Sequence, residues 1–365
     1  MRWIISIPLL LLLSGCADIG YYWHSASGHL NLMNQRVDID TLLADDKLDS
    51  HLRARLLLVQ DIRRFSIERL HLPSNGSYGN YVDLQQPYVI QNLFAAPEFS
   101  TRLHQWCYPI IGCASYRGYY DQTRLLAFAE ELQSQGLEVH VGRVPAYSTL
   151  GWFDDPVLSS FIDWPDYRLA GLLFHELTHQ QIYIDDDTTF NESLASAVQQ
   201  AGTVLWLQSS NQLEAQDEYR RWLVYRDAAI ALIVATRSEL GAIYASEMTD
   251  AEKRTRKAQQ FQQARNAHET IASHHGIEGG FKSWFADGLN NAKIGSVAAY
   301  NSRLNAFIRI LDALGTDFPA FYRYVETLSK LGRATRNQCL DAWEQSLEST
   351  AAVCPALEEQ PTVDA

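Results

Sequence analysis

The chain has 365 residues, of which 47% are hydrophobic and 20% are charged, and its formal net charge is -13. This length and apolar content are sufficient for a full hydrophobic core in one large domain or two smaller ones. The negative charge, without a cluster of Lys and Arg, excludes nucleic acid as a partner, because binding to phosphates requires such a cluster.

The first sixteen residues, MRWIISIPLLLLLSGC, predict a secretory signal. The apolar run from Trp3 to Leu13 is too short for a membrane-spanning helix of the mature chain. The segment LSGC resembles a lipobox, in which the signal is cleaved before Cys16 and this Cys carries the lipid. We therefore expect a lipoprotein signal peptide at 1–15 and a lipidated linker at 16–27. An ordinary signal peptide with a chance Cys is the alternative.

The predicted lipid on Cys16 indicates a membrane anchor. Ala17 would be the second residue of the mature chain, and it does not resemble the signal that retains lipoproteins at the inner membrane. We therefore expect the protein to be anchored at the outer membrane, facing the periplasm of a Gram-negative cell.

The periplasm is oxidising, which favours disulfides among the other four cysteines. Of the three possible connectivities we favour the two local pairings, Cys107 with Cys113 and Cys339 with Cys354. Buried free thiols are the alternative.

The mature chain is predicted to form one α+β domain that is mainly helical. Apolar residues recur at helical spacing over 28–72, whereas 73–115 is rich in Pro, Gly, Asn and aromatics, which is typical of strands and turns. The segment 121–136 predicts a helix that stops at a Gly. Two short strands are expected over 137–153. The second of them, VPAYSTLGWF, is either an edge strand that binds extended peptide beside a cleft or an ordinary sheet strand.

Almost all residues from 166 to about 330 are predicted to be helical, so the domain over 28–365 divides into an α/β part, 28–165, and a helical part, 166–365. Glycines interrupt this helical part at 276, 279, 280 and 315. A long helical hairpin is expected over 211–275. The charged run EKRTRK would form its solvated turn, and the apolar run AAIALIVA, which is too short to span a membrane, would lie in the core.

The stretch LAGLLFHELTHQQ contains the residues on which the functional prediction depends. His175 and His179 are four positions apart on a predicted helix, so both imidazoles project from one face. Two nitrogens at this spacing can share one zinc ion, and Glu176 would lie where a base activates a zinc-bound water. The motif occurs by chance in about one chain in a hundred of this length. The neighbouring residues are apolar, however, and it would cost free energy to bury three polar side chains among them without partners.

A zinc hydrolase needs a third protein ligand. Glu192, in NESLAS, can reach the metal if a second helix returns antiparallel to the first. Alternatively, Thr189 and Glu192 form a capping box at the start of that helix. The run Asp185, Asp186 and Asp187 predicts a solvated loop, in which one carboxylate could orient a histidine.

The segments HELTHQ and FNESLAS together resemble the gluzincin arrangement of zinc peptidases. More closely, YRGYYD, VPAYSTLGWFDDP, FHELTHQ, DTTFNESLAS and LNNAK resemble a bacterial lipoprotein family of predicted zinc aminopeptidases, over nearly all of the mature chain. The resemblance implies a zincin-like fold, a peptide substrate and one Zn2+ ion. It also implies His175, His179 and Glu192 as ligands, and Glu176 as general base.

Two departures from related enzymes affect the predicted specificity. The chain lacks a GAMEN segment, whose Glu binds the free amine of an aminopeptidase substrate, and Ser196 replaces an Asp that supports a histidine in thermolysin-like enzymes. The prediction is a zinc aminopeptidase. The alternatives are a zinc endopeptidase and an inactive zincin-like binding or structural lipoprotein.

Peptidases of this type often use a Tyr or His of the helical part to stabilise the oxyanion. Tyr300 is the candidate, with a core aromatic residue as the alternative. Asn290 and Asn291 either hold the substrate backbone or cap a helix. His274 and His275 are expected only to end a helix.

Overall fold

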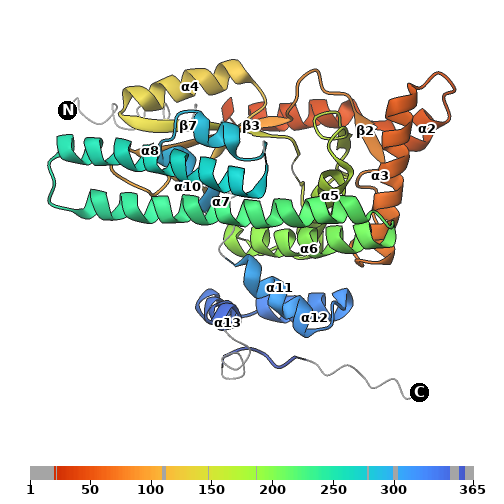
Figure 1. Cartoon of the computed structure of the whole chain (residues 1–365). Coiled ribbons are helices and arrows are strands. Elements are labelled where there is room, and N and C mark those ends of the chain that lie inside the picture. Colours follow the sequence, from red (N-terminus) through yellow and green to blue (C-terminus); the bar gives the residue numbers. More distant parts are fainter. Residues whose placement is uncertain are drawn as a thin grey trace, which may run out of the picture.

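The structure is a computed structural model that describes residues 20–21, 23–108, 112–146, 148–185, 187–277, 279–298, 303–345 and 353–357. It is mainly helical, with three small sheets (Figure 1). The strands are β1 Val37–Asp38, β2 Asn80–Val82, β3 Ile90–Pro97, β4 Trp106–Tyr108, β5 Gly112–Ala114, β6 Arg117–Tyr119, β7 Leu137–Val144 and β8 Val157–Leu158. The helices are α2 Ile39–Leu43, α3 Ser50–Glu68, α4 Gln122–Ser134, α5 Asp166–Gln181, α6 Thr188–Ser209, α7 Leu213–Ala245, α8 Asp250–His275, α9 Lys282–Ala286, α10 Asn291–Ala298, α11 Leu304–Ala313, α12 Phe318–Ser329 and α13 Arg333–Gln345.

The largest sheet has the order β6-β3-β7 and is antiparallel throughout. Side chains of β3 alternate between its two faces. Leu93 and Ala95 pack with residues of α4 on one face, and Phe94 and Ala96 pack with Ala292 of α10 on the other. The sheet is therefore covered by helices on both sides, with α4 outermost in Figure 1.

The helix predicted over 121–136 is confirmed as α4. The carboxylate of Asp121 caps it by accepting hydrogen bonds from the backbone N–H groups of Thr123 and Arg124. Gly136 follows the helix at a φ of 80°, in the left-handed region that favours Gly.

Only one of the two strands predicted over 137–153 forms, as β7. None of the described residues between 145 and 153 lies in a strand, so the predicted edge strand is wrong for them. The carboxylate of Asp155 accepts a hydrogen bond from the backbone N–H of Thr149, and this local bond replaces strand pairing. Tyr147 lies outside the described residues.

The predicted hairpin over 211–275 is confirmed as α7 and α8, but its turn lies earlier, at 246–249. Thr249 and Glu252 form a capping box there, so the charged run begins α8 and does not form the turn. Lys257 of this run is buried and pairs with Glu138 of β7, contrary to the expected solvated turn. His275 ends α8, as expected.

The apolar segment 228–235 lies within α7, which is packed along one side. Ala229 and Ile233 are buried in a cluster with Phe261 of α8, whereas Val234 is 48% exposed. By length and composition alone, α7 is the one helix among the described residues that could cross a membrane. That test is weak, because helices packed in a protein core also pass it.

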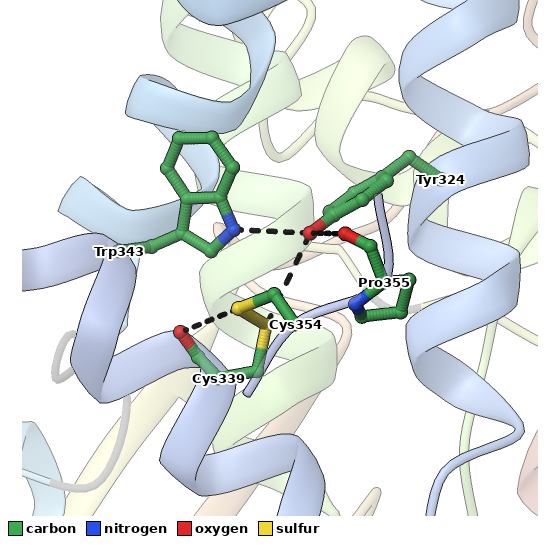
Figure 2. Close-up of a disulfide and its surroundings, with 5 residues drawn as sticks. All are labelled: Tyr324, Cys339, Trp343, Cys354 and Pro355. Carbon is green, nitrogen blue, oxygen red and sulfur yellow. Dashed lines mark hydrogen bonds between the residues drawn. A yellow bond between two sulfur atoms is a disulfide. The ribbon is translucent and has the colours of Figure 1, made fainter. Parts of the chain in front are cut away.

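The structure contains both local disulfides that the sequence favours. Cys107–Cys113 joins β4 to β5, and Cys339–Cys354 joins α13 to the segment 353–357 (Figure 2). At the other end of the chain, residues 23–34 are helical. The last part of the linker predicted for 16–27 therefore lies in a helix.

The main core joins the predicted α/β part to the helical part. It connects α3, α5 and α6 with the carboxy-terminal helices α11–α13, which lie beneath α6 in Figure 1. Phe190 of α6 and Phe307 of α11 meet edge to face with ring centroids 5.1 Å apart. Both are fully buried, so α11 and α6 share one hydrophobic interior.

Candidate metal centre

The helix α5 carries His175, Glu176 and His179, and it is fixed by an apolar face. Leu169, Leu173 and Phe174 are fully buried against the core. The polar face is thereby directed towards α6, which lies alongside α5 (Figure 1).

The helix α6 begins two residues earlier than a capping box with Thr189 as its N-cap requires. Asp187 is its N-cap, and its carboxylate accepts a hydrogen bond from the backbone N–H of Phe190 at 3.3 Å. Glu192 consequently lies in the second turn and faces α5. The capping-box alternative for Glu192 is therefore wrong.

Three potential ligand atoms converge between these helices. The Nε2 atoms of His175 and His179 are 3.2 Å apart. The carboxylate of Glu192 places one oxygen 3.3 Å from Nε2 of His175 and the other 3.7 Å from Nε2 of His179. Ligand atoms at about 2.0–2.1 Å from a tetrahedral zinc ion lie about 3.3–3.4 Å from one another. The two-nitrogen, one-carboxylate set therefore fits a zinc ion in both chemistry and spacing.

A fourth side chain orients the first of these ligands. Nδ1 of His175 lies 3.1 Å from the amide oxygen of Gln199, which follows Glu192 by about two turns of α6. If Nδ1–H donates to this oxygen, the lone pair of Nε2 points to the convergence point. Among the described residues, Gln199, and not Asp185 or Asp187, is thus the orienting partner of His175. Its spacing of seven from Glu192 was the only available signal in the sequence.

Burial and the interaction between His175 and Glu192 together set the protonation of the three side chains. Burial, with a contribution from His175, lowers the pKa of His179 to about 4, which favours the neutral imidazole that a metal requires. For Glu192, burial alone would raise the pKa, but the hydrogen bond and charge of His175 hold it below its usual range. For His175, burial opposes the charged form, while Glu192 outweighs that effect and raises the pKa. Glu192 is therefore an anionic carboxylate beside the two histidines.

Glu176 lies on α5 next to the ligands and is 8% exposed. Burial, reinforced by the charges of Glu192 and Asp155, raises the pKa of Glu176 to about 7. A carboxyl group with this pKa can both accept and release a proton near neutral pH. The environment of Glu176 thus suits a general base.

The loop 148–155 is fastened to the end of α5 that carries His179. Nε2 of Gln180 donates to the carboxylate of Asp155 at 3.1 Å, and the backbone N–H of Tyr78 donates to the carbonyl of Asp155 at 2.6 Å. Tyr78 is buried at a φ of 59°, a conformation that is costly for a residue with a side chain. The pKa of Tyr78 is raised well above its usual range by burial and by the charges of Glu176 and Asp155.

Two tyrosines that the sequence reasoning missed lie near the ligands. The ring of Tyr183 is 6.3 Å from that of His179 and nearly perpendicular to it. Burial, followed by the charge of Glu192, raises the pKa of Tyr116 to about 12. Tyr116 belongs to the segment YRGYYD, which the sequence reasoning used only for the resemblance.

Of four further predicted residues, the structure describes two. Tyr300 and Cys16 fall outside the described residues. Asn291 is fully buried, and its amide donates to the carbonyls of Pro97 and Glu98, while Asn290 caps α10 by accepting from the backbone N–H of Lys293. Asn290 therefore has the capping role, whereas Asn291 joins α10 to the end of β3.

The aspartates of 185–187 differ from one another. Asp185 is exposed, as predicted, and Asp186 lies outside the described residues. Asp187 is 5% exposed and pairs with Arg336 of α13. The prediction of a solvated loop is wrong for Asp187, because a distant part of the chain supplies its counter-charge.

The chain was compared with known proteins. A family model described as "Putative aminopeptidase" matches residues 20–340, which include α5, α6 and most of α13. No curated protein and no solved structure gives a significant match to the chain.

Proposed function

The chain belongs to the aminopeptidase family matched over residues 20–340, and from this premise we propose that it is a zinc-dependent aminopeptidase. The observation that carries the proposal is the convergence of His175, His179 and Glu192 to spacings that fit one zinc ion. Glu176 beside them, with a pKa of about 7, supports an active enzyme over an inactive binding protein. The arrangement resembles that of gluzincins.

Each side chain has a definite task in this proposal. A zinc ion held by His175, His179 and Glu192 would supply polarisation of the scissile carbonyl and of a water molecule. Glu176 takes a proton from the attacking water and passes it to the leaving amine. Gln199 holds the ring of His175 in the tautomer that leaves Nε2 free for the metal.

The proposal includes a location. The segment LSGC supports cleavage before Cys16 and lipidation of this residue. Acyl chains on Cys16 would anchor the enzyme in the outer membrane, facing the periplasm, where it would meet peptide substrates.

The first experiment measures zinc per chain by elemental mass spectrometry, for the parent protein and for His175→Ala. We expect about one zinc ion in the parent and little in the variant, because only two ligands remain. If both proteins, supplied with zinc and kept free of chelators, hold equal and negligible metal, the zinc site is refuted.

A second experiment separates aminopeptidase from endopeptidase activity. Matched peptides with a free or an acetylated amino terminus are incubated with the zinc-loaded enzyme, and the products are identified by mass spectrometry. We expect release of the first residue from the free peptide only. Internal cleavage of both peptides would instead indicate an endopeptidase.

A further inference from the structure

The helix α13 is connected to the segment around Glu192 at two points, directly at Asp187 before this residue and through Arg303 at Ser193 after it. We propose that α13 is a brace that positions Glu192 for metal binding, through Arg336 on one side and Asp341 on the other. The inference rests on the proposed zinc site and concerns residues that do not touch the metal.

The first contact is a buried ion pair at the start of α6. Nη2 of Arg336 lies 2.5 Å from Oδ2 of Asp187, and the two residues are 4% and 5% exposed. The other oxygen of Asp187 accepts the capping hydrogen bond from the backbone N–H of Phe190. Arg336 therefore neutralises the carboxylate that defines where α6 begins, five residues before Glu192.

Arg336 is itself rigidly held. Its Nη1 donates to the carbonyl of Leu331 at 2.8 Å, and its guanidinium lies over the ring of Phe190 at 5.4 Å. A second arginine of the same helix, Arg333, approaches Oδ1 of Asp187 at 3.7 Å. The amino-terminal turn of α6 is thus fixed against the amino-terminal turns of α13.

The second contact lies immediately after Glu192. The hydroxyl of Ser193 accepts a hydrogen bond from the backbone N–H of Arg303 at 3.3 Å. The side chain of Arg303 forms an ion pair with Asp341 and a longer one, at 3.5 Å, with Glu344. Arg303 therefore links the residue next to the ligand to the second half of α13.

A disulfide fixes α13 between these two contacts. Cys339 lies between Arg336 and Asp341 in the helix and is bonded to Cys354 (Figure 2). Figure 2 also shows the hydroxyl of Tyr324 of α12, which accepts from Nε1 of Trp343 at 3.1 Å and donates to the carbonyl of Pro355 at 3.2 Å. The disulfide and this tyrosine join α13, α12 and the segment after Cys354 into one unit.

If Glu192 is a metal ligand, these contacts would hold its side chain in position. A zinc site tolerates only small displacements of its ligands. Mutation of residues that hold the ligands from outside typically lowers metal affinity by about 10–100-fold. Without Arg336, the buried carboxylate of Asp187 would lack a counter-charge and the first turn of α6 would have to shift. Such a shift would be transmitted one turn further, to Glu192.

The test is the zinc dissociation constant of the full mature chain, measured by competition with a chelating dye. We expect Arg336→Gln to raise this constant by about tenfold or more. In the double variant Asp187→Asn, Arg336→Gln, we expect partial recovery, because Asn still caps α6 and no unpaired carboxylate is left buried. Asp341→Asn, at a half-exposed position that should not prevent folding, should raise the constant a few-fold.

The matched control is Lys257→Gln, which breaks another buried ion pair, with Glu138, at the end of β7 away from loop 148–155. It should lower the urea midpoint of unfolding while leaving the zinc dissociation constant unchanged. Removal of the disulfide by Cys339→Ser with Cys354→Ser should instead weaken zinc binding.

The outcomes separate the brace from the zinc site itself. If the parent chain binds no zinc, the proposed function fails. If the parent binds zinc and both Arg336→Gln and Asp341→Asn retain its dissociation constant, even with lowered stability, α13 has only a structural role and the brace is refuted.

Discussion

Glu176 and His179 lie on the same helix, and burial acts on them in opposite directions. It raises the pKa of the carboxyl group to about 7 and lowers that of the imidazole to about 4. In both cases the uncharged form is favoured, because water that would solvate the charge is excluded. One apolar environment thereby gives a neutral imidazole that can bind a metal and a carboxyl group that can exchange a proton near neutral pH.

The proposed role of Glu176 as the base gives a direct prediction. Glu176→Gln retains the shape of the side chain but cannot accept a proton, so peptide hydrolysis should fall by about 10²–10⁴-fold. The zinc content, measured in parallel, should remain that of the parent. Glu130→Gln, an exposed carboxylate on α4, serves as the control with parental activity. Full hydrolysis by Glu176→Gln would remove the base assignment.

The hydrogen bond between Gln199 and His175 gives a second prediction. Gln199→Leu removes the acceptor at Nδ1, so the ring loses its preferred tautomer, and zinc affinity should fall by about tenfold. Gln199→Glu keeps an acceptor at this position and should restore most of the affinity. Equal dissociation constants for the Leu variant and the parent would show that the contact has no influence on the metal.

At the scale of elements, the sequence predicted those features whose cause is local. Asp121 and Gly136 delimit α4 because capping and left-handed backbone depend on single residues. The spacing of His175 and His179 predicted their common face for the same reason. The segment 145–153 was not predictable in this way, because its conformation depends on Asp155, which binds both its own loop and the side chain of Gln180.

The strand β7 carries a histidine that makes stability depend on pH. The ring of His140 stacks on Phe94 of β3, with centroids 6.1 Å apart. Burial, followed by the charge of Lys293, lowers the pKa of His140 to about 4, compared with 6.5 when it is exposed. Below pH 6.5 the unfolded chain therefore binds a proton that the folded chain does not.

Consequently, the free energy of unfolding should decrease as the pH falls from about 6.5 to about 4, by at most about 3 kcal/mol from this residue. In His140→Gln this contribution should vanish, so its stability should change less over that range. The measurement is the urea midpoint at a series of pH values. The same pH dependence in parent and variant would contradict the assignment.

At the scale of the whole molecule, the candidate site draws on parts of the chain that the sequence could not connect. His175, His179 and Glu192 were predictable because they lie within eighteen residues. Gln199 was much less so, since only its spacing of seven from Glu192 distinguishes it from other polar residues of α6. Arg336 was still harder to predict, because it lies 149 residues from Asp187 and only tertiary packing brings the two together.

The proposed anchor is also a property of the whole molecule. Labelling of cells with a fatty-acid analogue should mark the protein, and Cys16→Ser should abolish the label and release the protein from the membrane fraction, because no acyl chain is then attached. A variant with Cys113→Ser controls for the loss of any cysteine. Continued labelling of Cys16→Ser would refute lipidation at this position.

The position of α13 near the carboxyl terminus determines the order in which the site can be completed. The motif HELTH leaves the ribosome well before Arg336, which follows Asp187 by 149 residues. At about 5–20 residues per second, this separation corresponds to a delay of roughly ten to thirty seconds. During that interval α6 lacks the partner of its capping carboxylate, and neither cysteine of the Cys339–Cys354 disulfide has been made. The newly made chain therefore carries all of its metal-ligand side chains before it has the architecture that holds them in place.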